Sequence, residues 1–245
     1  MNKELLINRV ISVLSKGGFV ISERCDIRPR SFDLAARCDD ILLLIKVLYN
    51  IDGLNEETAR EMQFLSSHLQ GHSLIIGEKT RDHSLEGGVV YLRFGIPAFD
   101  ISTLEDYFIE NIPPLIYAAH GGLYVNIDGS SLKDERIRKN ISLGALASLL
   151  GVSRRTISKY EQGEMAASVD LALKLEEIMD RGFAVAVELF AQVHPDKTTR
   201  QDTGQRPGIF SLLEDMGFNV LPTTQAPFDA VSISTKRSYE KATIL

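Results

Sequence analysis

Apolar residues recur at helical spacing in some stretches of the first 112 residues and run together or alternate in others. Spacings of three and four positions favour amphipathic helices, whereas short aliphatic runs bounded by turn residues favour strands. The predicted elements are, in chain order, a helix at 5–14, a strand at 19–22, a hairpin of strands at 30–36 and 41–47, a helix at 56–69, strands at 73–77 and 89–93, and a helix at 101–110. This order predicts an α/β domain.

A different pattern occupies residues 142–163, where two short amphipathic segments each follow a serine. Ser142 and Ser153 are N-cap candidates, because a hydroxyl can accept a hydrogen bond from a free amide at a helix start. Ala147 is small where the two helices would cross, and Gly151 can adopt the left-handed conformation at the turn. The predicted buried side consists of Leu146, Leu149, Leu150, Val152, Ile157 and Tyr160. The pattern indicates two helices joined by a tight turn.

These residues resemble the phage-repressor (Xre/Cro) helix-turn-helix family, and the likeness extends from 132–140 to 168–180. The resemblance implies that double-stranded DNA is bound through the second helix in the major groove. It places Arg154, Arg155 and Lys159 at base edges and Ser142, Ser153 and Thr156 near phosphates, with Ser158 also among the DNA-binding residues. It also pairs Arg136 with Glu161 as a structural ion pair. Leu143 departs from the family, which often has Gln after the first cap.

Charge is distributed unevenly along the chain. Residues 130–163 carry seven Lys and Arg against three acidic residues, whereas the whole chain of 245 residues has a net charge of −6. A basic face on an acidic protein can dock on phosphates while the remaining charge opposes non-specific binding. No stretch is long and apolar enough for a membrane span, and the N-terminal residues do not show the charged-then-apolar pattern of a leader. We therefore expect a cytoplasmic protein that does not associate with a membrane.

The predicted N-terminal domain resembles the restriction-endonuclease-like fold, in which an Asp and a Glu-x-Lys triplet on adjacent strands hold a metal. Asp33 matches the Asp and Lys46 the Lys, but Leu44 stands where the second carboxylate is expected. A hard cation such as Mg²⁺ needs several oxygen ligands. Substitute carboxylates from neighbouring helices are Glu4, Glu57 and Glu61. We favour a vestigial site, with no catalytic residue, metal or cofactor, on a scaffold that binds a partner or dimerises.

The rest of the chain shows two further features. Apolar residues at helical spacing continue to 193, and Gly182 is a candidate break between two helices. We interpret the surplus apolar residues at 183–193 as core, with a dimer face or docking on the N-terminal domain as the alternatives. The last segment repeats the order of the N-terminus, an apolar helix, Gly-Phe, a strand, Phe-Asp and a second strand, so that Phe228 and Asp229 correspond to Phe32 and Asp33. This second copy is shorter than the first.

We therefore expect an α/β (α+β) multidomain chain. Its predicted segments are a non-catalytic nuclease-like α/β domain at 1–112, a linker with a short hairpin at 113–129, an all-α helix-turn-helix domain at 130–193, a linker at 194–206 and a partial second α/β repeat at 207–245. As a whole the sequence resembles the archaeal HTH-type transcriptional regulators, whose members are usually somewhat longer. The resemblance implies DNA-binding regulation, and we expect a sequence-specific regulator of transcription rather than an enzyme. We expect a homodimer because one recognition helix reads only a few base pairs. The alternatives are a metal-dependent nuclease targeted by the helix-turn-helix, and an antitoxin-like or adaptor protein whose N-terminal domain chiefly binds another protein.

Overall fold

The structure is a computed structural model that describes residues 2–26, 28–190, 208–234 and 242–244. The chain divides into two compact units, one made of residues 1–85, 93–101 and 190–245, and the other of residues 86–92 and 102–189. No helix among the described residues is long and apolar enough to cross a membrane.

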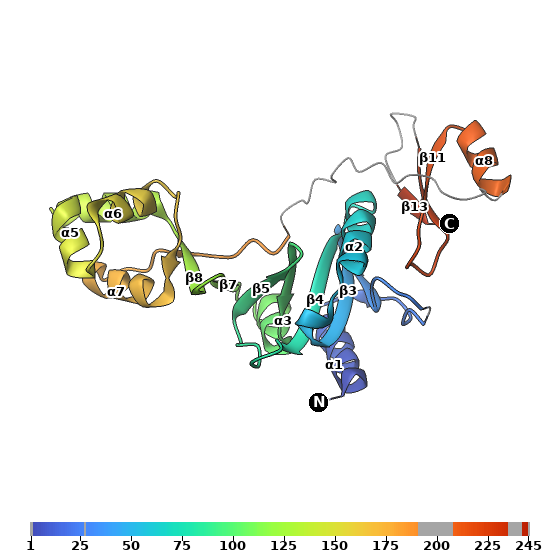
Figure 1. Ribbon diagram of the computed structural model, residues 1–245, viewed down its shortest axis with the longest axis horizontal. Helices are drawn as coiled ribbons and strands as arrows, with labels where there is room; N and C mark the ends of the chain where they lie inside the picture. The colour runs from blue at the N-terminus through green and yellow to red at the C-terminus, as the bar shows by residue number, and fades with distance from the viewer. Residues whose placement is uncertain (1, 27, 191–207, 235–241, 245) are drawn as a thin grey trace. The chain divides into compact units, whose positions relative to one another are not determined.

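The first unit contains a mixed sheet with helices packed on it (Figure 1). Its elements are α1 (Lys3–Lys16), β1 (Val20–Ile21), β2 (Leu34–Cys38), β3 (Ile41–Asn50), the 3₁₀ turn Ile51–Gly53, α2 (Glu56–His68), β4 (His72–Lys79) and β6 (Ile96–Phe99). The strand order is β1-β2-β3-β4-β6, in which β1, β2 and β3 pair antiparallel while β3–β4 and β4–β6 are parallel. The predicted helices and the hairpin are present, and β6 is a strand that the pattern did not indicate.

Local sequence explains the hairpin that carries the nuclease-like residues. Cys38 pairs with Ile41 across a two-residue turn, and Asp39 takes a positive φ of 49° that Asp tolerates better than most residues. The middle of β3, residues 43–47, is buried throughout. Apart from Lys46 these residues are apolar, and a run of this kind suits a strand that is covered on both faces.

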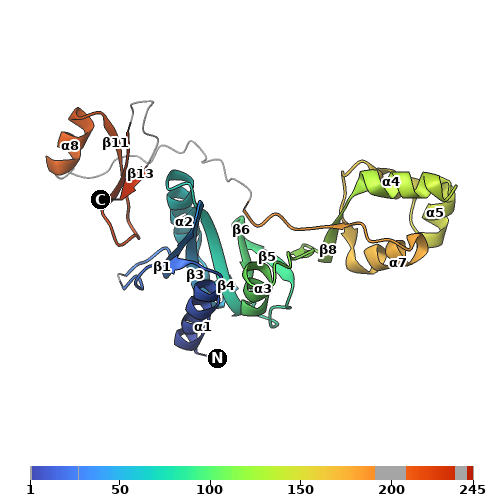
Figure 2. The same ribbon diagram turned by 180° about the vertical axis from the view of Figure 1, so that it is seen from behind.

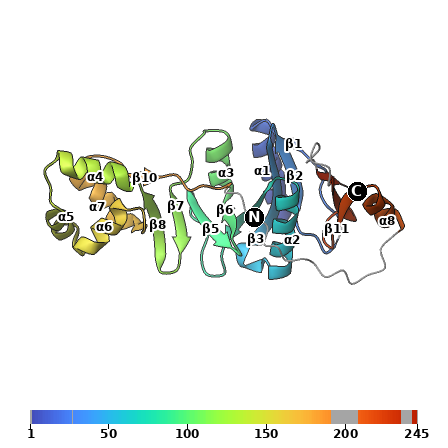
Figure 3. The ribbon, with the colours of Figure 1, turned by 90° about the horizontal axis from the view of Figure 1, so that it is seen from above.

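The C-terminal part of the first unit forms a small three-stranded sheet. Its elements are α8 (Gly208–Asp215), β11 (Phe218–Pro222), β12 (Ala230–Ser234) and β13 (Ala242–Ile244). The three strands pair antiparallel in chain order, and α8 packs against β11 (Figure 3). The helix, strand and strand of the predicted repeat are thus present. We call residues 208–234 the half-repeat.

The second unit joins a few strands to a helical bundle (Figure 2). Its elements are β5 (Val89–Arg93), α3 (Ile101–Phe108), β7 (Ile116–Ala119), β8 (Gly122–Ile127), α4 (Gly129–Arg138), α5 (Leu143–Leu150), α6 (Arg154–Glu161), β9 (Ala167–Ser168), α7 (Val169–Met179) and β10 (Ala184–Val185). The β7–β8 hairpin is antiparallel, and β8 continues into the bundle, where β9 and β10 pair with it.

The prediction of a second helix beyond Gly182 is wrong. Helix α7 ends at Met179, and its C-cap Asp180 adopts the left-handed conformation with φ 52°. The chain then extends, so that Phe183 is 2% exposed and its carbonyl accepts the Asp128 amide at 2.8 Å. Residues 184–185 pair with β8. Apolar residues at helical spacing were insufficient here, because pairing with a distant strand decided the local conformation.

Candidate nucleic-acid interface

Serine caps and a left-handed glycine set the geometry of the two central helices. The Ser142 hydroxyl accepts the Ala145 amide at 3.1 Å at the start of α5, and the Ser153 hydroxyl accepts the Thr156 amide at 3.1 Å at the start of α6. Gly151 has φ 70° and ends α5. Because a left-handed residue is disfavoured for side chains with a Cβ, glycine allows the chain to turn directly into α6.

A single apolar core fixes α5 and α6 against the other helices and β8. Its fully or nearly fully buried members are Val125, Ile127, Leu132, Leu146, Ala147, Leu150, Ile157, Tyr160, Ala167, Ala172, Leu175, Met179 and Phe183. Most of the residues predicted for the buried side belong to it. Leu149 does not, since it is 61% exposed, and Val152 is only partly buried at its edge. The buried face of α5 is therefore narrower than the spacing of its leucines predicted.

Helix α6 separates an apolar side from a basic one. Ile157 and Tyr160 are buried, whereas Arg154 and Arg155 are exposed at its first turn. Lys159 lies one turn further along and is half-buried. With its inner side held by the core, α6 presents the two arginines at a fixed position on the surface.

The small polar residues lie at the two helix starts. The hydroxyls of Ser153 and Thr156 are 2.9 Å apart, and that of Ser142 caps α5. Ser158 is half-buried on α6. Gly144, in the first turn of α5, faces Arg154: a Cβ there would stand 2.8 Å from the Arg154 Nε. The absence of a side chain at Gly144 lets the guanidinium lie across α5.

Arg136 and Glu161 form a nearly buried, two-point ion pair between α4 and α6. The Arg136 Nε donates to Glu161 Oε1 at 2.5 Å and a second guanidinium nitrogen donates to Oε2 at 3.1 Å. Arg136 also donates to the Ile141 carbonyl at 3.0 Å. The hydrogen bond to Glu161 raises the pKa of Arg136 above its already high ordinary value. The pair connects the helix before the helix-turn-helix to the end of α6.

In the first unit, the carboxylate of Asp33 is fully buried and surrounded by cations. Lys3 donates to both of its oxygens at 3.0 and 3.2 Å, and the Arg30 Nε lies 2.8 Å from Oδ1. The Val47 amide donates to Oδ2 at 2.8 Å. Burial acts to raise the pKa of Asp33, but the Val47 amide and Lys3 outweigh it and the net shift is downward.

Lys46 is nearly buried on the neighbouring strand and donates to the Arg30 carbonyl at 2.6 Å. Burial lowers the pKa of Lys46, with the Asp33 charge opposing it. Sequence reasoning identified Asp33 and Lys46 but missed Lys3 and Arg30, the groups that hold the carboxylate. Arg30, three residues before Asp33, was the one available signal; Lys3 is thirty residues away.

The possible substitute carboxylates do not gather around Asp33. Glu4 is exposed and paired with Arg24, and Glu57 is exposed on α2. Glu61 is 1% exposed and accepts hydrogen bonds from Thr224. Within the described residues, no three His, Cys, Asp or Glu side chains are placed to hold a metal ion together. The donor set around Asp33, with Leu44 at the second carboxylate position, does not fit Mg²⁺.

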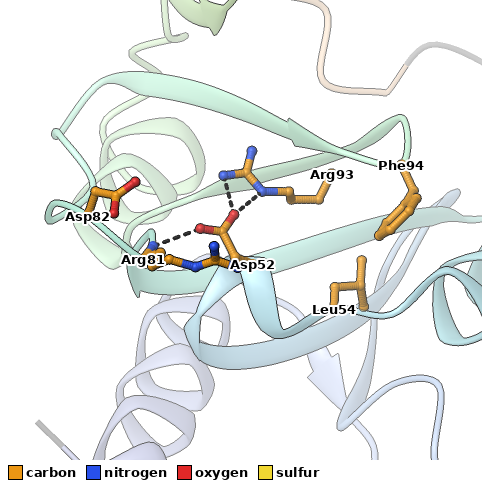
Figure 4. A pocket seen from close by; sticks show the side chains of 6 residues that line it. All are labelled: Asp52, Leu54, Arg81, Asp82, Arg93 and Phe94. Carbon is orange, nitrogen blue, oxygen red and sulfur yellow. Dashed lines mark hydrogen bonds and ion pairs between the residues drawn. The ribbon is translucent and has the colours of Figure 1, made fainter.

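A charged pocket that the sequence pattern did not indicate lies at the end of β3 (Figure 4). Asp52 accepts the Arg81 amide at 2.7 Å on one oxygen and the Arg93 Nε at 2.6 Å on the other. Figure 4 shows Phe94 and Leu54 on the side of the pocket opposite Arg81 and Asp82. Because both oxygens of Asp52 are engaged, this carboxylate braces the surrounding turns.

These features define a helix-turn-helix protein with a nuclease-like N-terminal domain. The descriptions of matching families agree with it: the PD-(D/E)XK superfamily domain matches residues 3–114, and a helix-turn-helix family matches residues 132–185. No solved structure matches the chain.

Archaeal relatives that share about half of the residues match almost the whole chain. Those from Methanococcoides burtonii (52% identity, 98% of this chain and 76% of the relative), Methanosarcina mazei (50%, 95% and 75%) and Methanocella arvoryzae (52%, 95% and 74%) are each named "Putative HTH-type transcriptional regulatory protein". The chain belongs to this family of archaeal HTH-type transcriptional regulatory proteins.

Proposed function

We propose that the protein is a sequence-specific DNA-binding regulator of transcription that inserts α6 into the major groove. The observation that carries the proposal is the arrangement of α6, with Arg154 and Arg155 exposed at its first turn and Ile157 and Tyr160 locked in the core. Helix-turn-helix proteins contact base edges with the N-terminal residues of their second helix. The names of the relatives support the same function.

Arginine and lysine on this helix would read bases. A bidentate contact from Arg154 or Arg155 to a guanine would contribute about 1–3 kcal/mol of discrimination. Lys159 would contact a neighbouring base edge. We assign the phosphate contacts to the small hydroxyl residues around the two helix starts and on α6: Ser142, Ser153, Thr156 and Ser158.

One recognition helix covers only a few base pairs, so we propose a homodimer that binds two half-sites about one helical turn apart. The domain limits that we propose are those expected from the sequence, with DNA binding in 130–193; residues 191–193 and the linker expected at 194–206 lie outside the described residues. The site of action would be the cytoplasm, where archaeal DNA lies.

The nuclease-like domain serves, in this proposal, as a non-catalytic scaffold. Lys3 and Arg30 engage Asp33 where a metal would need its oxygens, and Leu44 supplies no ligand. A cation bound there would have to displace two protein cations from a buried carboxylate. The alternative function, a targeted metal-dependent nuclease, is favoured only by the family match of residues 3–114.

One experiment separates the two functions. The full-length protein is incubated with a random duplex library in Mg²⁺, and both bound sequences and cleaved ends are recovered. We expect a two-fold symmetric motif on intact DNA. Arg154→Ala or Arg155→Ala should relax selection at one base position per half-site, while Lys174→Ala, an exposed cation on α7, should leave the motif unchanged.

Uniform loss of affinity for all sequences in the arginine variants would reassign these residues to phosphates. Cleaved ends that disappear in a folded Asp33→Asn variant would instead establish the nuclease.

A further inference from the structure

The half-repeat contacts the nuclease-like domain through a buried glutamine. Gln225 is 3% exposed, and its carbonyl accepts both the Ser31 amide at 2.7 Å and the Ser31 hydroxyl at 2.9 Å. Its side-chain oxygen accepts the Thr58 hydroxyl at 3.0 Å. Thr58 lies in the first turn of α2, so Gln225 bonds both the strand side and the helix side of the same domain.

A second polar contact engages the buried carboxylate of Glu61 on α2. Thr224 donates its amide to Oε1 at 3.2 Å and its hydroxyl to Oε2 at 3.3 Å. A buried carboxylate without hydrogen-bond donors is costly. Loss of Thr224 from this position would therefore remove two donors from Glu61.

Apolar side chains continue the same contact. Cys25, Phe32, Leu44 and Leu65 of the nuclease-like domain form one buried cluster with Val231 of the half-repeat, and Ala226 and Phe228 pack at its edge. Phe32 and Phe228 are the equivalent positions of the two sequence copies, and they meet in this one cluster. Their neighbours differ, since Asp33 is fully buried whereas Asp229 is exposed.

The half-repeat also has a core of its own. Phe210, Val220 and Ala230 are buried together, with Leu213 and Phe218 beside them. Residues 224–231 therefore belong to a small folded element that contacts the nuclease-like domain.

We propose that this face of the nuclease-like domain is a protein-docking surface whose ligand is the half-repeat of the same chain. The docked segment covers Leu44, the position where a nuclease would carry its second carboxylate, together with Ser31, Thr58 and Glu61. DNA or another protein can reach this face only after the half-repeat is released. The proposal concerns the first unit alone and is independent of DNA binding by α6.

Two native thiols measure the docking directly. Cys25 is 5% exposed within the shared cluster, whereas Cys38 at the end of β2 is partly exposed and lies outside that cluster. The experiment treats the full-length protein with a maleimide and follows each cysteine by mass spectrometry. Hydrogen exchange of the Ser31 amide is recorded in parallel, since this amide donates to Gln225.

The docking variants are Phe228→Ser and Gln225→Ala, and the control is Leu212→Ser, whose side chain is 59% exposed on α8. We expect the docking variants to accelerate Cys25 labelling and Ser31 exchange about tenfold or more, because both report opening of the same contact. Cys38 labelling should not change, and the control should behave as the unmodified protein.

The proposal would be overturned if Cys25 labelling and Ser31 amide exchange were no faster in the docking variants than in the control. Protection that grows with protein concentration would also overturn it, because the ligand would then be the half-repeat of a second copy. Accelerated Cys38 labelling would reveal global unfolding of a variant. In that case the labelling and exchange rates of the other docking variant test the proposal.

Discussion

The Nε of Arg136 lies 2.5 Å from Oε1 of Glu161, which joins α4 to the end of α6 across 25 residues of sequence. The two side chains are only 11% and 8% exposed. Removing one partner from such a pair leaves an uncompensated charge in a low-dielectric environment. While both side chains are present, their electrostatic attraction nearly cancels the cost of removing the two charges from water.

We therefore predict that Arg136→Met or Glu161→Leu destabilises the helix-turn-helix by about 3 kcal/mol. The double variant Arg136→Met/Glu161→Leu should recover much of the loss, since no charge is left unpaired. Chemical denaturation of the four proteins measures the coupling. Additive losses would show that the two side chains act separately.

Gly129 has no room for a side chain. A Cβ at this first residue of α4 would lie 2.3 Å from the Tyr160 carbonyl oxygen and 2.6 Å from that of Glu161. Since both obstacles are backbone atoms, Gly129→Ala must move α4 away from α6 and should cost about 1–3 kcal/mol or more. Thermal unfolding measures the effect. An unchanged midpoint would mean that α4 and α6 can separate without loss.

Gly144→Ala is the matched substitution with the opposite expectation. The new Cβ would meet only the end of the flexible Arg154 side chain, so stability should hold or rise by a few tenths of a kcal/mol, as helix propensity favours alanine. The displaced guanidinium should nevertheless alter the bases selected by α6. Selection from a random duplex library provides the measurement. An unchanged motif would show that base selection by Arg154 does not depend on the space at Gly144.

Local signals in the sequence were sufficient for much of this fold. Ser142, Gly151 and Ser153 marked the helix-turn-helix, because caps and left-handed turns depend on neighbouring residues. The β2–β3 hairpin could be predicted for the same reason. Non-local partners were beyond such reasoning: β10 forms by pairing with β8, and Leu149 is exposed because no element in the described part of the chain covers it.

The candidate sites likewise divide into features set by neighbouring residues, which the sequence predicts, and contacts between distant residues, which it does not. The pattern placed Arg154 and Arg155 on one side of α6, since helical periodicity fixes their direction. It did not reveal that Lys3 and Arg30 neutralise Asp33 or that Gln225 reaches Ser31 and Thr58. These contacts join residues up to 194 positions apart. Only the folded arrangement of the sheet and the half-repeat brings them together.

Asp128 at the start of α4 should make the helix-turn-helix sensitive to acid. Hydrogen bonds from the hydroxyls of Ser130 and Ser131, both 2.6 Å, and from the Ser131 amide lower its pKa to about 2. The pKa is lower in the folded state, so this stabilisation is present above the ordinary Asp value near 3.8 and is lost as the pH falls toward 2.

We predict that Asp128→Ala costs about 0.5–2 kcal/mol at neutral pH, the usual effect of removing an N-cap. The difference between the two proteins should shrink as the pH is lowered from 4 to about 2. Denaturation midpoints across this range measure it. A difference that does not change with pH would assign the effect to packing rather than to the charged cap.

The last prediction concerns the buried charges of the nuclease-like domain. Lys3, Arg30 and Lys46 lie around the single carboxylate of Asp33, so Asp33→Asn would leave cations without their counter-charge. We expect a loss of about 3–5 kcal/mol from the first unit. Because the pKa of Asp33 is lowered in the folded state, the stability that its charge provides is present above the ordinary Asp pKa and is lost in acid.

The helix-turn-helix should be unaffected by Asp33→Asn, because its core contains no residue of the nuclease-like domain. Denaturation followed by Cys25 labelling for the first unit, and by operator binding for the second, separates the two effects. If Asp33 instead served a metal, Mg²⁺ would stabilise the unmodified protein and not the variant. We expect Mg²⁺ to leave both denaturation midpoints unchanged, since Lys3 and Arg30 already compensate the carboxylate.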